Sequence, residues 1–200
     1  MTRARAADFE EKQLHILNSA AAVFAELGME KASMSQIAIR SDVSKALLYH
    51  YYPSKGALIF DIIHSHLEQL SEAVEQVAKE SAADLPEVRL RKIVSQILEC
   101  YRDADNHHKV QLNCHGSLPK EEELEINRLE RKIVLLVADT IREINPEIND
   151  VRPLLKPVTM SLFGMLNWVY MWFKPNGPIT REEYADLATT LILEGLRNIR

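Results

Sequence analysis

Apolar residues recur at the three- to four-residue spacing of an amphipathic helix along most of the chain. This spacing predicts helices over about residues 9–27, 33–40, 45–51, 54–77, 86–101, 119–144, 150–173 and 180–196. Runs in which apolar and polar residues alternate between turn signals, the pattern of a strand, are nearly absent. The pattern therefore predicts an all-α protein.

Residues 33–58 carry the clearest local signals, those of two short helices joined by a tight turn and followed by a third helix. Ser33 and Gln36 have the spacing of a capping box, and Ser44 is placed to cap the second short helix. Asp42 falls in the turn, where a residue that tolerates the left-handed conformation is favoured. A short helix with small and basic residues at its start, held across another helix, is the geometry that enters a DNA major groove.

The helical spacing that begins at Ser54 continues for more than twenty residues, which corresponds to about 30 Å of helix. We expect this helix to link a small N-terminal unit to a larger helical domain. The predicted division is a helix-turn-helix DNA-binding domain at residues 1–53 and a helical ligand-binding and dimerisation domain at residues 54–200.

The net charge of −5 argues against a generally basic coat for nucleic acid. The charges are uneven, because residues 1–60 carry seven Lys/Arg and six Asp/Glu whereas the remainder carries seventeen and twenty-three. The N-terminal part is therefore the less acidic one, although only weakly.

Two cysteines do not form a disulfide framework, and the N-terminus lacks a hydrophobic signal segment, so we expect a cytoplasmic protein. Residues 158–173 carry no charged side chain, but they number only sixteen and include Thr159, Ser161 and Asn167. A membrane span needs about 20 mostly apolar residues, so this stretch is interpreted as a buried helix.

Residues 162–173 are apolar on nearly every face, and the last helix contains Gly195 and several alanines that allow close helix approach. Together the two helices suggest a dimer interface built from two helices of each subunit. The candidate interface residues are Leu162, Met165, Leu166, Leu187, Leu191 and Gly195.

The residues allow three alternative interpretations. His107, His108, Cys114 and His115 could serve a metal-responsive regulator, although they lack the tight spacing of a structural zinc site. The three-helix unit could also serve a helical protein–protein adaptor. Catalysis has little support, because Ser, His and Asp do not occur in a nucleophile-elbow or triad-like context, so we predict no catalytic residue, no cofactor and no enzyme activity.

A longer pattern includes Ile16, Ala20-Ala21, Phe24, Gly28, Ile37-Ala38, Val43-Ser44-Lys45, Leu48-Tyr49, Tyr52, Ser54-Lys55 and Leu58. In this fixed spacing the chain resembles the tetracycline-repressor (TetR) family of bacterial regulators. The resemblance implies a homodimeric transcriptional repressor that binds a palindromic operator in double-stranded DNA. Two residues depart from the family pattern: Asp42 stands where the turn usually has Gly, and Gly56 stands where Glu is usual.

The resemblance also implies DNA contacts, with Lys45 and Ala46 meeting base edges. The groups implied to contact phosphates are those of Ser33, Ser44, Tyr49, His50 and Lys55. Arg40 is expected to add a charge contact. The alternatives are that Tyr49 belongs to the core and that Arg40 is a solvated surface residue.

The segment Phe163-Gly164-Met165-Leu166-Asn167-Trp168, with Trp172 and residues 175–179, is similar to regulators that respond to acyl-CoA thioesters. Those regulators control fatty-acid, sterol or aromatic-acid degradation. The resemblance implies a small hydrophobic effector, and an all-helical domain with aromatic helices is compatible with holding an acyl chain. The candidate ligand-binding residues are Tyr101, Leu136, Phe163, Asn167 and Trp168.

Overall fold

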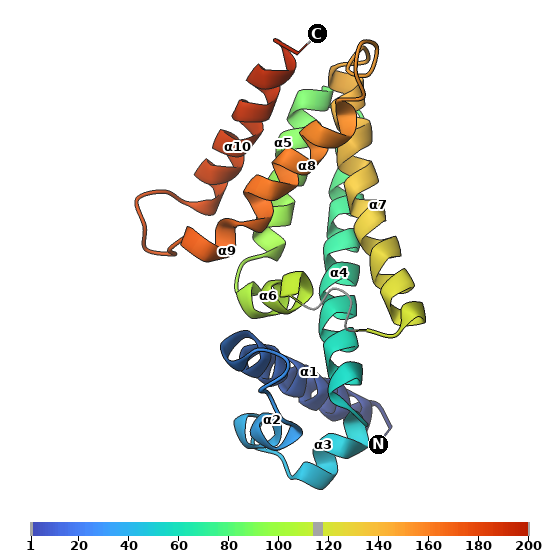
Figure 1. Cartoon of the computed structure of the whole chain (residues 1–200), viewed down its shortest axis with the longest axis vertical. Coiled ribbons are helices and arrows are strands. Elements are labelled where there is room, and N and C mark those ends of the chain that lie inside the picture. Colours follow the sequence, from blue (N-terminus) through green and yellow to red (C-terminus); the bar gives the residue numbers. More distant parts are fainter. Residues whose placement is uncertain (1, 114–117, 200) are drawn as a thin grey trace. The chain divides into compact units, whose positions relative to one another are not determined.

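The computed structural model describes residues 2–113 and 118–199, and Figure 1 shows the arrangement of their helices. These are α1 (Thr2–Leu27), α2 (Met34–Arg40), α3 (Lys45–Tyr51), α4 (Lys55–Glu80), α5 (Pro86–Cys100), α6 (Asp105–Asn113), α7 (Lys120–Ile144), α8 (Leu155–Asn167), α9 (Val169–Trp172) and α10 (Arg181–Leu196). The described ranges contain ten helices and no strand, which confirms the predicted all-α class. None of the helices in these ranges is both long and apolar enough to cross a membrane.

The chain forms two compact units. The first comprises the described residues up to Leu67 and those within Asp103–Ile126, and the second comprises Glu68–Arg102 and the described residues from Asn127 onward. Helix α4 contributes residues to both units.

In the first unit, α1 packs against α2 and α6, and α2 packs against α3. Ile16, Ala20 and Phe24 of α1 are buried, as the apolar stripe of this helix predicted. Gly28 ends the helix with a φ of 76°, and its amide donates to the Phe24 carbonyl over 2.9 Å. The glycine therefore takes the left-handed conformation that commonly follows the end of a helix.

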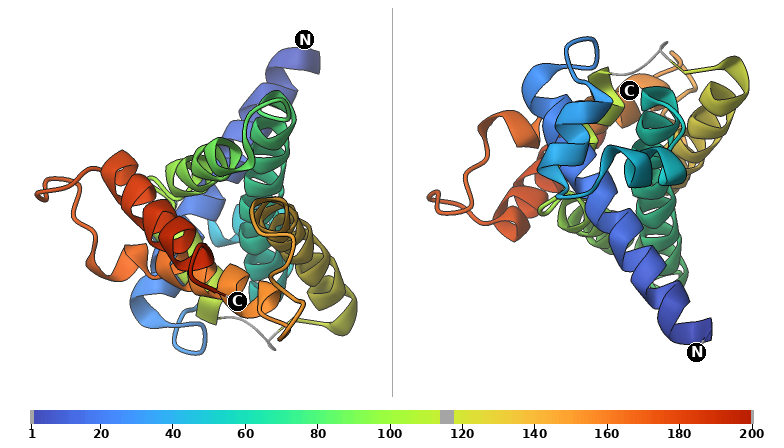
Figure 2. Two further views of the ribbon diagram at one scale, coloured as in Figure 1. Left: turned by 90° about the horizontal axis from the view of Figure 1, so that it is seen from above. Right: turned by 90° about the horizontal axis from the view of Figure 1, so that it is seen from below.

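In the second unit, α5 and α10 lie side by side, which can be followed in Figures 1 and 2, and α8 packs against both helices. The three helices bury an aliphatic core that includes Leu90, Ile93, Ile97, Leu162 and Leu166. This core confirms that the apolar positions of α5 face inward.

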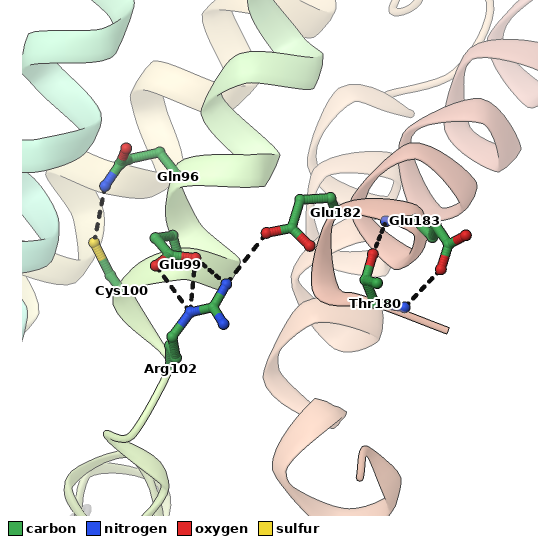
Figure 3. A network of polar contacts seen from close by, with 7 residues as sticks. All are labelled: Gln96, Glu99, Cys100, Arg102, Thr180, Glu182 and Glu183. Atoms are coloured by element: carbon green, nitrogen blue, oxygen red, sulfur yellow. Dashed lines mark hydrogen bonds and ion pairs between the residues drawn. The ribbon is translucent and has the colours of Figure 1, made fainter. Parts of the chain in front are cut away.

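Polar contacts join the end of α5 to the start of α10, as Figure 3 shows. The Arg102 guanidinium donates to Glu99 over 2.7 Å and to Glu182 over 3.2 Å. Thr180 and Glu183 form a capping box at the start of α10, with the Glu183 amide donating to Thr180 Oγ1 over 3.1 Å. These contacts fix where α10 begins relative to α5 within their unit.

Two segments differ from their predicted structure. The apolar spacing predicts no helix between residues 101 and 119, but α6 forms there and buries His108, Val110 and Gln111. Its buried positions are mostly polar, so the apolar spacing gave no helical signal. The single helix predicted over residues 150–173 is divided at Trp168 into α8 and α9.

Candidate functional site

Helices α2 and α3 are joined by the tight turn that the sequence predicted. The Ser41 amide donates to the Ile37 carbonyl over 2.9 Å, and the Val43 amide donates to the Ala38 carbonyl over 3.0 Å. Asp42 lies between them with a φ of 49°. This residue takes the left-handed conformation in place of the family's usual Gly, so the departure at Asp42 preserves the turn.

Both short helices begin at a capping serine. At α2 the Gln36 amide donates to Ser33 Oγ over 3.3 Å, while the Ser33 amide donates to Gln36 Oε1 over 2.9 Å. At α3 the Leu47 amide donates to Ser44 Oγ over 3.1 Å. The predicted caps are therefore confirmed. The Ser33 hydroxyl also donates to Gln36 Oε1 within its box, over 2.8 Å.

Helix α3 divides into a buried and an exposed face. Leu48 is completely buried and holds the helix against its unit. Lys45, Ala46, Tyr49 and His50 are all exposed, and their spacing places them on adjoining positions of one face. Tyr49 is 45% exposed, so it does not belong to the core.

Arg40 lies at the end of α2 and pairs with a carboxylate of α1. Its Nη2 lies 3.0 Å from Glu26 Oε1, and more than half of each side chain is exposed. The guanidinium is therefore neither buried nor simply solvated, and Glu26 holds it on the surface of the first unit.

A partly buried polar cluster holds the end of α3, and the sequence pattern did not predict it. The Tyr52 hydroxyl, directly after α3, donates to Asp61 of α4. Gln13 of α1 donates to the same hydroxyl over 3.1 Å and to the Asp61 carboxylate over 3.3 Å. Burial, together with the hydrogen bond to Asp61, raises the pKa of Tyr52, so the phenol stays a neutral donor. The cluster ties α3 to both α1 and α4.

Of the candidate ligand-binding residues, Tyr101 and Asn167 are in direct contact. The Tyr101 hydroxyl donates to Asn167 Oδ1 over 2.9 Å, and the phenol ring is buried. Burial raises the pKa of this phenol, so it too remains protonated. Phe163 is 6% exposed, Leu136 is half-buried and Trp168 is 57% exposed. Trp168 therefore lies on the surface of the second unit, unlike Tyr101 and Phe163.

Each unit has a surface depression among its described residues. The larger, of about 420 Å³, lies between the end of α1, the following loop and α6. The smaller, of about 330 Å³, lies beside the ends of α7 and α10. None of the five candidate ligand-binding residues lines either depression.

The candidate interface residues separate into buried and exposed groups within one chain. Leu162 and Leu166 are completely buried in the second unit, and Met165 is half-buried. Leu187 and Leu191 are 50% and 56% exposed, and Gly195 is exposed as well. An intersubunit contact can therefore use the α10 residues directly, whereas Leu162 and Leu166 serve the core of their own subunit.

Histidines from two helices meet in the first unit. The His66 ring of α4 lies 6.2 Å from the His107 ring and 6.0 Å from the His108 ring, both on α6. Within the described ranges, no group of three or more His, Cys, Asp or Glu residues is arranged to hold a metal ion. Cys114 and His115, the other half of the predicted metal set, lie outside the described residues, so the metal alternative stays a prediction.

Comparison with known proteins agrees with this architecture. Residues 16–62 match the family described as bacterial regulatory proteins, tetR family, and residues 83–196 match the tetracyclin repressor-like C-terminal domain. Among curated relatives, the uncharacterised regulator YuxN of Bacillus subtilis is 28% identical over 116 residues, which cover 58% of this chain and 39% of YuxN. The chain thus spans about two fifths of the length of the first curated relatives it matches.

Two solved structures cover nearly the whole chain. A TetR-family regulator from Bordetella parapertussis is 32% identical, with a TM-score of 0.85 over 94% of this chain and 97% of that one. AibR, solved with isovaleryl coenzyme A and operator DNA, is 27% identical, with a TM-score of 0.75 over 90% of this chain and 97% of that one. On the domain matches and this full-length similarity, the chain belongs to the TetR family of helix-turn-helix transcriptional regulators.

Proposed function

We propose that this regulator binds a palindromic operator as a homodimer and represses transcription until a small hydrophobic effector releases it. The observation that carries the proposal is the outer face of α3, where Lys45, Ala46, Tyr49 and His50 are exposed on a helix that Ser44 caps. Base edges in a major groove are within reach of such a face, and the helix start favours a phosphate near Ser44. Ser33 and Arg40 flank this face and would add contacts to the DNA backbone.

Dimerisation follows from the small number of basic groups on that face. One α3 helix offers few contacts, so useful specificity requires two half-sites about 34 Å apart. Leu187, Leu191 and Gly195 form an exposed stripe on α10 that supports an intersubunit contact. Met165 of α8 is half-buried, and its carbonyl accepts a hydrogen bond from Tyr184 of α10. Burying two such apolar stripes would supply the hydrophobic core that a stable dimer needs.

An acyl-CoA thioester is the effector class that we propose. AibR, at 27% identity, was solved with isovaleryl coenzyme A and operator DNA, which supports a related ligand here. Tyr101, Phe163 and Asn167 would line the acyl site, with Leu136 and Trp168 at its edges. The Tyr101–Asn167 hydrogen bond supplies polar groups beside an apolar ring, a combination suited to a thioester carbonyl next to a short acyl chain.

Release would operate through α4, which contributes residues to both units. The effector must bind the DNA-free conformation more tightly than the DNA-bound one, and each tenfold loss of DNA affinity requires about 1.4 kcal/mol of this difference. A shift of α4 would change the separation of the two α3 helices and so their fit to successive major grooves.

Selection from a pool of random duplexes tests the DNA-binding part. The expected product is an inverted repeat, bound with an affinity that falls steeply as salt rises, because phosphate contacts release counterions. Lys45→Ala should weaken binding and leave the dimer intact. Failure to enrich any repeat, together with a flat salt profile, would favour the protein–protein adaptor instead.

Thermal unfolding with isovaleryl-CoA, free CoA and isovalerate tests the effector class. A ligand at 100 times its Kd stabilises the folded state by about 2.7 kcal/mol, so a specific thioester should raise the Tm clearly above both fragments. The same thioester should release the selected operator. If a panel of thioesters of different chain length leaves the Tm unchanged, the acyl-CoA proposal is wrong, although DNA binding is unaffected by that result.

A further inference from the structure

Lys55, the first residue of α4, stands where the family resemblance implies a phosphate contact, yet its ammonium group bonds to backbone carbonyls of the α1–α2 connection. Nζ donates to the Met29 carbonyl over 2.9 Å and to the Ala32 carbonyl over 3.0 Å, and the Glu30 carbonyl lies 3.5 Å away. An ammonium group has three donors, and three carbonyls of one loop surround this one. Its hydrogen-bonding capacity is therefore used within the first unit.

The loop that Lys55 contacts is the connection between α1 and α2. A Cβ placed on Gly28 would meet no atom within 4 Å, and Glu30 is exposed. One side of the loop borders the depression of about 420 Å³. Ala32 is buried and its amide donates to the Gly28 carbonyl over 3.1 Å. The Lys55 ammonium thus supplies the side-chain hydrogen bonds that fix the loop carbonyls.

Electrostatics favour this contact over an outward position. A positive charge in the first turn of a helix opposes the helix dipole, so Lys55 is unfavourably placed with respect to α4 alone. The carbonyls of Met29 and Glu30 follow directly after the end of α1, where the partial charge is negative. One ammonium therefore joins the start of α4 to the end of α1, and the loop leads from there into Ser33, which caps α2.

We propose that Lys55 is a positioning residue that fixes the α1–α2 connection to α4, and so orients α2 and α3 for operator binding without itself contacting a phosphate. The inference rests on the proposed DNA binding. In that binding Lys55 holds the α1–α2 connection in place and does not contact a phosphate. Movement of α4 would be passed to α2 through these carbonyl contacts as well as through α3.

The test compares Lys55→Met, Lys55→Arg and Lys45→Met in the full-length protein on the selected operator. Each lost phosphate contact lowers the slope of log affinity against log salt by about 0.9, so a dimer that loses two contacts changes by about 1.8. We expect Lys55→Met to weaken binding at least about tenfold with an unchanged slope. Lys55→Arg should be similarly defective, because a planar guanidinium cannot direct its donors to three carbonyls around one point.

Hydrogen exchange of the DNA-free protein gives a second readout. Amides of residues 29–34 should exchange faster in both Lys55 variants and at the wild-type rate in Lys45→Met. A reduced salt slope in Lys55→Met, full binding by Lys55→Arg, or unchanged exchange in the loop would each overturn the proposal. If Lys55→Met does not fold, Lys55→Arg carries the same comparison. If the wild-type protein binds no operator, the proposed function is refuted. The exchange experiment would still test whether Lys55 holds the loop carbonyls.

Discussion

The Tyr101 hydroxyl donates a hydrogen bond of 2.9 Å to Asn167 Oδ1, which joins the residue after α5 to the last residue of α8. The two residues are 66 positions apart, and the phenol is buried, so the bond fixes the ends of two helices that share a core. Removing the phenol hydroxyl deletes this hydrogen bond to Asn167, and losing one member of a bonded pair costs more than replacing both members.

We therefore expect Tyr101→Phe to lower the free energy of unfolding by about 1–3 kcal/mol in urea titrations. The double variant Tyr101→Phe/Asn167→Leu should lose less than the sum of the single changes, because the residues are coupled. If the loss in the double variant equals the sum of the two single losses, the Tyr101–Asn167 hydrogen bond does not contribute to stability. The thermal shift produced by a binding thioester should also be reduced in Tyr101→Phe, if this pair lines the acyl site.

Ser44 allows helix capping to be separated from DNA contact. Ser44→Ala removes the acceptor for the Leu47 amide and should destabilise the protein by about 0.5–2 kcal/mol. Ser44→Asp keeps a capping oxygen and a favourable charge at the start of α3, so it should unfold close to the wild-type urea concentration. It should nevertheless abolish operator binding, since a carboxylate would face a phosphate. If Ser44→Asp still binds the operator, α3 does not lie in the DNA interface.

Local signals in the sequence predicted much of this architecture correctly. The caps at Ser33 and Ser44 and the left-handed residue at Asp42 depend only on neighbouring residues, and the structure confirms all three. Membership of a family of transcriptional regulators also confirms that the chain is not an enzyme.

The sequence pattern could not predict features that depend on tertiary contacts. Helix α6 was missed because its buried side chains include His108 and Gln111, which carry no apolar periodicity. The direction of the Lys55 side chain depends on a loop more than twenty residues earlier in the chain. Likewise, spacing along a helix could not show that Leu162 is buried in its own subunit while Leu191 stays exposed.

The exposed stripe of α10 gives a direct test of dimerisation. Leu191→Glu places a charge at the centre of the proposed interface and should convert the dimer to a monomer in sedimentation experiments, because an unpaired buried charge is strongly unfavourable. Leu135→Glu is a matched control, since Leu135 is 48% exposed on α7 and Leu191 is 56% exposed on α10. The control should remain dimeric. If the Leu191→Glu protein remains a dimer, the interface does not include this stripe.

The buried histidine of α4 predicts that stability falls in mildly acidic solution. Burial, reinforced by the neighbouring His108 and His107, lowers the pKa of His66 to about 3, while the same group in an unfolded chain titrates near its ordinary value of 6.5. Between these two pH values the unfolded chain binds a proton that the folded protein does not, so stability is lost as the pH falls. Burial also lowers the pKa of His107, which acts in the same direction.

The expected loss between pH 7.5 and pH 5 is on the order of 2 kcal/mol from His66, measured as the free energy of unfolding in urea at each pH. His66→Gln should flatten this dependence, whatever its effect on stability at pH 7.5. His50→Gln, which removes an exposed imidazole from α3, should keep the wild-type dependence. An unchanged pH profile in His66→Gln would show that other groups cause the acid sensitivity. Because His66 joins α4 to α6, the effect should also appear as faster hydrogen exchange in residues 105–113 at pH 5 than the change in intrinsic exchange rate accounts for.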